Sequence, residues 1–99
     1  MKVRFSPRAQ RRVKLVATWW RKNRPSAPTL FDDELDAVIE MLKNQPLLGA
    51  EYQMRGGELV RRTLLKKSAQ HVYYSVDEAN DAIVIYSVWG ARRGRGPKL

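Results

Sequence analysis

The sequence predicts an α+β protein in which a helical hairpin packs on a small antiparallel sheet, in the order β-α-α-β-β-β. Two observations predict this fold. The first half holds two segments whose apolar residues recur at steps of three and four, the spacing of one helix face. The last third holds three runs with the alternation of β-strands. A chain of 99 residues is expected to form a single domain, residues 1–99.

The first strand and the first helix are predicted next to each other. Residues 2–5 alternate charged and apolar side chains, as a short strand does. Ser6 is expected to cap the helix, with Pro7 at its first position, where the missing N–H costs nothing. Pro25 ends it, because a residue before proline avoids the α region. The apolar stripe of this helix is Ala9, Val13, Val16, Ala17 and Trp20, so we expect Trp20 in the core.

The second helix is predicted to begin at a Ser26 cap and to stop at Pro46. Residues 32–34 are acidic and lie near its positive end, where the helix dipole favours them. They are expected to form a solvated face. The apolar stripe consists of Phe31, Leu35, Val38, Ile39 and Leu42.

Residues 47–57 read as a loop, because glycines punctuate them. Strands are predicted over residues 59–65, 71–77 and 82–89, and they are expected to pair as a meander. In the last strand Ile83, Ile85, Ser87 and Trp89 alternate with Val84, Tyr86 and Val88, so both faces are apolar. That pattern suits a strand covered on both sides or one that meets a partner.

The net charge of +9 is unevenly distributed. Residues 1–24 hold nine Lys or Arg and no acid, residues 25–54 hold one base and six acids, and residues 55–99 hold nine bases and four acids. Such a distribution speeds the encounter with an anionic partner, either a nucleic acid or an acidic protein. Directly after the last strand, Arg92, Arg93 and Arg95 concentrate positive charge. Gly94, Gly96 and Pro97 favour a flexible tail over residues 91–99.

Several classes of site are excluded by composition. With one histidine and no cysteine we expect no metal site and no cofactor. No apolar run approaches the length of a membrane span, and no signal-peptide pattern is present, so a soluble cytoplasmic protein is expected. His71 lies between basic residues on neighbouring strands, which makes it a conceivable general base near phosphate. Packing is the commoner role of a lone histidine. Trp19 falls outside the apolar stripe and is either an edge-packing or a contact residue.

A family resemblance rests on five pieces in a fixed order, and it covers essentially the whole chain. With these pieces the chain resembles the RelE/ParE superfamily of bacterial type II toxin–antitoxin toxins, and it looks most like the ParE branch. The fold that the resemblance implies agrees with the predicted one. The pieces are Phe5-Ser6-Pro7-Arg8-Ala9, residues 42–46 with Gly49, Val60-Arg61-Arg62, residues 71–78 and residues 83–93.

The resemblance implies two alternative activities. ParE-like members are thought to poison DNA gyrase, without nuclease chemistry. RelE-like members are ribosome-dependent mRNA endonucleases, which need basic strand residues and an Arg with a Tyr or His near the C-terminus. Here His71 stands where the nuclease branch commonly has an arginine, Arg92 matches the C-terminal arginine, and no Tyr or His follows. Cleavage requires an acid and a base as well as charge. We therefore favour gyrase poisoning, with mRNA cleavage by His71, Arg62 and Arg92 as the alternative.

The resemblance also implies a cognate antitoxin that holds the toxin inactive. The charge distribution predicts that the wrapping C-terminal segment of this antitoxin is acidic and amphipathic. A third hypothesis is a plain basic nucleic-acid-binding module with strongly salt-dependent binding. The expected contact residues fall into two sets. Those for the antitoxin are Arg8, Arg12, Trp19, Val84, Tyr86 and Trp89, and those for the target are Arg61, Arg62, Arg92, Arg93 and Arg95.

Overall fold

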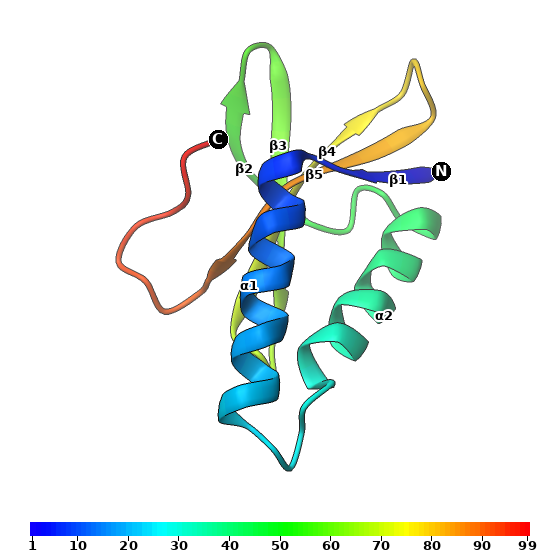
Figure 1. Cartoon of the computed structure of the whole chain (residues 1–99). Coiled ribbons are helices and arrows are strands. Elements are labelled where there is room, and N and C mark those ends of the chain that lie inside the picture. Colours follow the sequence, from blue (N-terminus) through cyan, green and yellow to red (C-terminus); the bar gives the residue numbers. More distant parts are fainter.

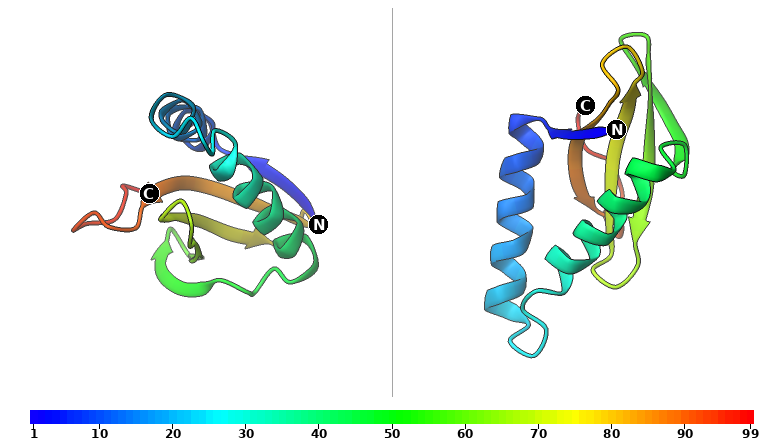
Figure 2. Two further views of the ribbon diagram at one scale, coloured as in Figure 1. Left: turned by 90° about the horizontal axis from the view of Figure 1, so that it is seen from below. Right: turned by 90° about the vertical axis from the view of Figure 1, so that its right-hand side faces the viewer.

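Two helices cover one face of a five-stranded sheet, and the other face of the sheet is free of helices (Figures 1 and 2). The computed structural model describes residues 1–99. The face without helices is called the open face below. The α+β class and the helical hairpin are confirmed. The elements are β1 (Lys2–Phe5), α1 (Pro7–Asn23), α2 (Leu30–Asn44), β2 (Ala50–Arg55), β3 (Glu58–Leu65), β4 (Gln70–Asp77) and β5 (Ala82–Gly90).

The sheet is mixed, with the strand order β1-β5-β4-β3-β2. The meander of β3, β4 and β5 is confirmed, since both of its pairings are antiparallel. In contrast, β1 pairs in parallel with the last strand, Val3 opposite Ile83 and Phe5 opposite Ile85. The connectivity is consistent with this pairing. Helices α1 and α2 carry the chain from β1 to the opposite edge of the sheet, where β2 begins, and one side of β5 is therefore free to pair with β1. The expectation of a purely antiparallel sheet is corrected in this respect.

Strand β2 was expected to be part of a loop, and this expectation is wrong. Ala50–Arg55 pairs antiparallel with β3 and forms the far edge of the sheet. Only Tyr52 among its six residues is even half-buried. An edge strand with almost no buried side chain has no apolar alternation, and that alternation is the signal from which strands are predicted. Gly56 and Gly57, both at positive φ, form its tight turn into β3.

Helix α1 begins as expected. The Ser6 hydroxyl accepts a 3.0 Å hydrogen bond from the Ala9 amide and donates one of 3.2 Å to the Tyr86 carbonyl. The cap therefore also fastens the start of α1 to β5. The expected Ser26 cap of α2 is wrong, because α2 begins at Leu30 with Thr29 at the capping position. Pro28 explains the delay, since a proline keeps the residue before it out of the α region.

The core lies between the helices and the sheet, and a bulge in β5 decides which residues enter it. Tyr73 pairs with Ser87 and Tyr74 pairs with Ile85, so Tyr86 is an extra residue in β5. The alternation of the strand is reversed there: Ile83, Ile85 and Val88 belong to the core cluster, and Ser87 does not. Trp20 packs against this cluster as expected. The remaining core residues include Ala9, Val16, Phe31, Leu42, Val72 and Tyr74.

Candidate functional site

Two arginines from distant parts of the chain meet on one indole ring. The guanidinium carbon of Arg12, on α1, lies 5.0 Å from the centre of the Trp89 ring, and that of Arg93, in the tail, lies 4.1 Å from it. Both distances are typical of cation–π contacts. Arg12 is further fixed because its Nε donates a 3.1 Å hydrogen bond to the Val88 carbonyl. Burial, with the nearby charge of Arg93, lowers the pKa of Arg12. A pair of fixed, mutually repelling cations is a site for an anion.

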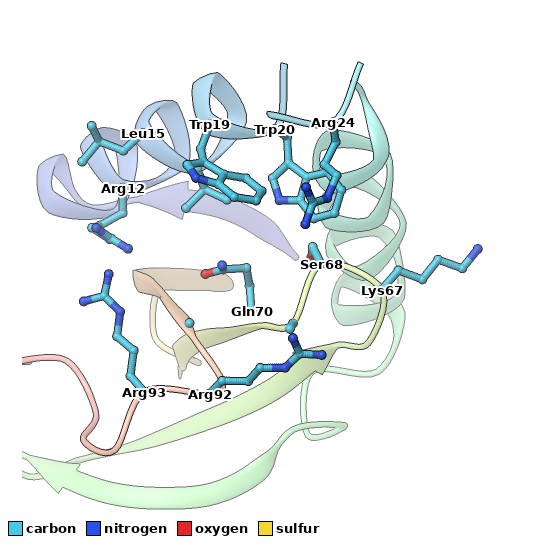
Figure 3. Close-up of a pocket in the computed structure, with 13 residues that line it drawn as sticks. Arg12, Leu15, Trp19, Trp20, Arg24, Lys67, Ser68, Gln70, Arg92 and Arg93 are labelled. Atoms are coloured by element: carbon cyan, nitrogen blue, oxygen red, sulfur yellow. The ribbon is translucent and has the colours of Figure 1, made fainter. Parts of the chain in front are cut away.

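A cavity of about 780 Å³ opens beside this pair, between the C-terminal half of α1 and the ends of β4 and β5 (Figure 3). It is called the first cavity below. Arg12 and Trp19 come from α1, Gln70 from β4, and Arg92 and Arg93 from the tail. The structure thus places two expected antitoxin contacts and two expected target contacts around the same hollow.

A second cavity, of about 440 Å³, lies between the start of α1 and the tail, and Arg12 and Trp89 belong to its wall. The tail closes it through backbone carbonyl groups. Trp89 Nε1 donates a 2.9 Å hydrogen bond to the Arg95 carbonyl, and Arg8 donates one of 2.6 Å to the Lys98 carbonyl. A Cβ atom at Gly96 would overlap the Tyr52 hydroxyl, so this glycine permits the close approach of the tail to β2. The tail is therefore fastened at several points, although it has no regular secondary structure.

His71 and Arg62 lie together on the open face. The guanidinium of Arg62 stacks over the Tyr52 ring at 4.9 Å, and the His71 ring lies 6.0 Å from that of Tyr73. Burial, with the positive charge of Arg62, lowers the pKa of His71. The imidazole is therefore neutral at pH 7 and able to accept a proton. No hydrogen bond joins either residue to Arg92, which lines the first cavity.

Arg61 does not belong with the other expected target residues. It pairs with Tyr74 in the β3–β4 ladder, on the face opposite to Arg62. Its guanidinium donates a 2.9 Å hydrogen bond to the Gly49 carbonyl and a longer one to that of Leu47. Arg61 thus supports the loop before β2. The five arginines are divided between this loop, the open face and the two cavities, since Arg95 lines the second one.

The open face also carries a polar group that the sequence did not indicate. The Tyr86 hydroxyl donates a 2.6 Å hydrogen bond to the Glu58 carboxylate and accepts one of 3.0 Å from Ser75. The guanidinium of Arg55 lies 4.6 Å above the Tyr86 ring. Burial, and then the hydrogen bond to Glu58, raise the pKa of Tyr86. This group could be predicted only by recognising strand β2, which carries Arg55, and the bulge, which places Tyr86. Neither feature produces an apolar pattern in the sequence.

The expected antitoxin contacts are divided by β5. Arg8, Arg12 and Trp89 line the second cavity. Trp19, which is 47% exposed, lines the first cavity. Val84 lies opposite Ser75 in the β4–β5 ladder and so shares the open face with Tyr86.

No group of three or more potential metal ligands occurs among His, Asp and Glu side chains. None of the helices combines the length and the apolar character that a membrane span requires.

A helical hairpin on a five-stranded sheet, with cations gathered around Trp89, defines a class of small basic α+β proteins. Two solved structures share the fold. The E. coli RelE toxin in the intact RelBE toxin–antitoxin complex is 21% identical, with a TM-score of 0.61, over 93% of this chain and 98% of that chain. The isolated E. coli RelE toxin in its P21 form is 18% identical, with a TM-score of 0.61, over 95% and 87%. A search of curated proteins finds no match.

The particular family follows from the sequence match. Residues 3–94 match the model of the ParE toxin of the type II toxin–antitoxin system, parDE. The chain belongs to this ParE toxin family, and it is a toxin of a type II toxin–antitoxin system. The expected superfamily is thereby confirmed, and a plain nucleic-acid-binding module loses its support. Toxins of this superfamily have an antitoxin as partner.

Proposed function

We propose that this toxin inhibits growth by poisoning DNA gyrase and that a cognate antitoxin neutralises it in the cytoplasm. The observation that carries the choice of target is the match to the ParE family over residues 3–94. The chemistry of the surface supports it. The walls of the two cavities hold neither histidine nor tyrosine nor a carboxylate beside Arg12, Arg92, Arg93 and Arg95.

We assign the target contacts to Arg62, Arg92, Arg93 and Arg95, with Arg61 in a supporting role. Arg93 stacks on Trp89, the Arg95 carbonyl accepts the hydrogen bond of the Trp89 indole, and Arg92 lines the first cavity. Arg62 lies on the open face. Binding to a protein–DNA complex through exposed arginines weakens as salt rises, because counterions are released.

The test of the target uses two assays with the same purified toxin. The first incubates it with gyrase, plasmid DNA and ATP and measures supercoiling and double-strand cleavage. The second incubates it with translating ribosomes and measures mRNA cleavage. We expect accumulated cleaved DNA and intact mRNA. Cleaved mRNA with unaffected gyrase would refute the proposal.

The alternative, ribosome-dependent mRNA cleavage, is favoured by one observation. His71 is neutral at pH 7 and lies beside the cation Arg62, as a general base next to phosphate would. No hydrogen bond joins His71 to a possible acid: Tyr73 lies next to it without bonding to it, and the Tyr86 hydroxyl on β5 donates its hydrogen bond to Glu58. A His71→Ala variant separates the two activities. Undiminished toxicity is expected for gyrase poisoning, and its loss is expected for cleavage.

For the antitoxin we propose an acidic, amphipathic segment bound by Arg8, Arg12, Trp19, Val84, Tyr86 and Trp89. The fixed guanidinium of Arg12 and the exposed indole of Trp19 offer a charged and an apolar contact on one helix. Titration calorimetry with the antitoxin tests this assignment. Trp19→Ala should weaken binding by about tenfold or more, as for an interface aromatic anchor. Leu15→Ala, an apolar change at a position of α1 that is 61% exposed, serves as the comparison.

A further inference from the structure

The first cavity combines residues assigned to the target and to the antitoxin with a group that neither assignment uses, the buried amide of Gln70. Its volume of about 780 Å³ lies in the range of small-molecule sites. In Figure 3 the Gln70 side chain stands in the middle of the hollow, with the indoles of Trp19 and Trp20 above it. Arg12 and Arg93 lie on one side of Gln70, and Arg24 and Arg92 lie on the other.

The four arginines of this cavity are not neutralised by acidic residues. The ion pairs of the structure lie elsewhere, at Arg4–Asp77, Arg21–Asp32 and Lys43–Glu40. No carboxylate is among the lining residues. Four guanidinium groups around one hollow repel each other until an anion enters, and they bind phosphate oxygens in pairs.

Two of these arginines are held in place before any ligand arrives. Arg12 is fixed by its hydrogen bond to the Val88 carbonyl, and both Arg12 and Arg93 rest on the Trp89 ring. Burial, with the charge of Arg93, lowers the pKa of Arg12. Pre-positioned donors lose little conformational entropy when a ligand binds.

The remaining features of the cavity favour a flat, hydrogen-bonding group next to the anion. Oε1 of Gln70 is buried and has no hydrogen-bond partner. A buried acceptor without a donor costs free energy, and a ligand N–H would remove that cost. Trp19 is 47% exposed and carries Arg24 at 5.2 Å from its ring centre. An indole beside a guanidinium is a surface on which a nucleobase stacks.

We propose that the first cavity binds a nucleotide, with its phosphates between Arg12 and Arg93, its base against Trp19 and a base N–H donated to Gln70. An acidic peptide also carries negative charge, but each of its carboxylates brings a single charge to the pair Arg12 and Arg93. Phosphate groups supply several charges in a small volume. The proposal deepens the proposed function, because the site shares Arg92 and Arg93 with the target contacts and Arg12 and Trp19 with the antitoxin contacts. ATP binding by the isolated toxin is measured without gyrase, ribosomes or antitoxin, so its failure is distinguishable from a failure of the target assignment.

The test uses the intrinsic fluorescence of the full chain, whose three tryptophans all lie at or next to the cavity. The probes are ATP, AMP, adenosine and inorganic phosphate, each without added metal. We expect saturable quenching by ATP with a Kd below about 1 mM, weaker binding of AMP, and no saturation by adenosine or phosphate in that range. Absence of ATP binding, or equal binding of adenosine, would overturn the proposal.

Matched variants locate the site. Arg93→Gln and Gln70→Leu should each weaken ATP binding by about fivefold or more, because a charge-assisted or a buried hydrogen bond is lost. Arg11→Gln removes the same charge next to Arg12 on α1, but outside the cavity, and should leave the Kd within about twofold. Equal losses for Arg93→Gln and Arg11→Gln would show only general attraction and would contradict the site. A circular dichroism spectrum confirms that each variant is folded.

Two competition experiments identify the source of the ligand. A 5′-phosphorylated DNA hexanucleotide that displaces ATP and binds more tightly supports a strand end as the natural ligand. A hexanucleotide that fails to displace ATP supports a free nucleotide. A glutamate-rich peptide that quenches the fluorescence saturably in a concentration range where ATP does not would instead assign the cavity to an acidic partner and refute the nucleotide.

Discussion

The backbone amide of Gly49 donates a 2.8 Å hydrogen bond to the hydroxyl of Tyr74, and a Cβ atom at position 49 would lie 2.6 Å from the same oxygen. The hydroxyl in turn donates a 2.9 Å hydrogen bond to the Pro46 carbonyl. Tyr74 is fully buried in the core cluster, so the loop that leads into β2 is fastened from inside the molecule. Only a residue without a Cβ allows this approach.

The contact predicts that Gly49→Ala destabilises the protein. The added methyl group must displace a buried ring or the loop, which typically costs about 1–3 kcal/mol. Urea denaturation followed by tryptophan fluorescence measures the loss. Gly94→Ala is the matched control, because a Cβ there meets nothing within 4 Å. Equal midpoints for the two variants would contradict the buried contact.

Glu34 predicts a dependence of stability on acid. Its carboxylate accepts hydrogen bonds from the Ser68 hydroxyl at 2.6 Å and from the amides of Lys67 and Ser68 at 2.8 and 3.0 Å. Burial opposes ionisation, but these bonds and the charge of Lys67 outweigh it, so the pKa of Glu34 lies below its ordinary value of 4.5. Glu34 was expected on a solvated face, but its hydrogen bonds join α2 to the β3–β4 turn.

Because this pKa is lowered in the folded state, the stability that Glu34 contributes is fully present above about pH 4.5 and is lost as the pH falls through the folded value. Glu34→Gln should cost about 1–2 kcal/mol at pH 7 and progressively less in acid. Denaturation midpoints between pH 3 and pH 7 measure the difference. Glu40→Gln, on the exposed side of α2, should change little at any pH. A constant difference for Glu34→Gln across this range contradicts the assignment.

His71 predicts a second titration. Its pKa lies below 6.5 because of burial and then of the charge of Arg62. The folded state therefore takes up its proton at lower pH than the unfolded state, and His71 makes stability fall as the pH drops below about 6.5. Arg62→Gln should raise the pKa of His71 towards that value without reaching it, since burial remains. A series of histidine NMR spectra measures it, and Arg95→Gln should leave it unchanged. An unmoved pKa in Arg62→Gln would remove Arg62 from the surroundings of His71.

The close contact of Gly96 with Tyr52 leads to a prediction about the protease resistance of the tail. Gly96→Ala places a methyl group on the Tyr52 hydroxyl and should detach the tail from β2, whereas the core stays intact. Trypsin should then cut after Arg93 and Arg95 several-fold faster than in the unchanged protein. Mass spectrometry of timed digests gives the rates, with Gly94→Ala as the control. If both variants are cut at the same rate, the contact with Tyr52 does not hold the tail.

The sequence predicted those elements that bury a regular apolar face, and it missed those that do not. The stripes of α1 and α2 and the alternation in β4 predicted their elements because each face enters the core. Strand β2 buries no regular set of side chains. The bulge at Tyr86 shifts the register, so Val88 and not Ser87 faces the core, and no residue near the bulge indicates this shift in the sequence. The site was predicted in part for the same reason. Arg61 and Arg62 are neighbours in sequence, but successive strand residues point to opposite faces, so only one reaches the open face.

The parallel pairing of β1 with β5 has a consequence for biosynthesis. The ribosome makes β1 and α1 well before β5, yet both dock on β5. The Ser6 cap, the Arg12 hydrogen bond and the ring of Trp89 likewise join residues about eighty positions apart. Long loops must close before these contacts form. A nascent chain thus holds Arg12 apart from Trp89 until β5 has left the ribosome, so α1 alone cannot form the toxic surface.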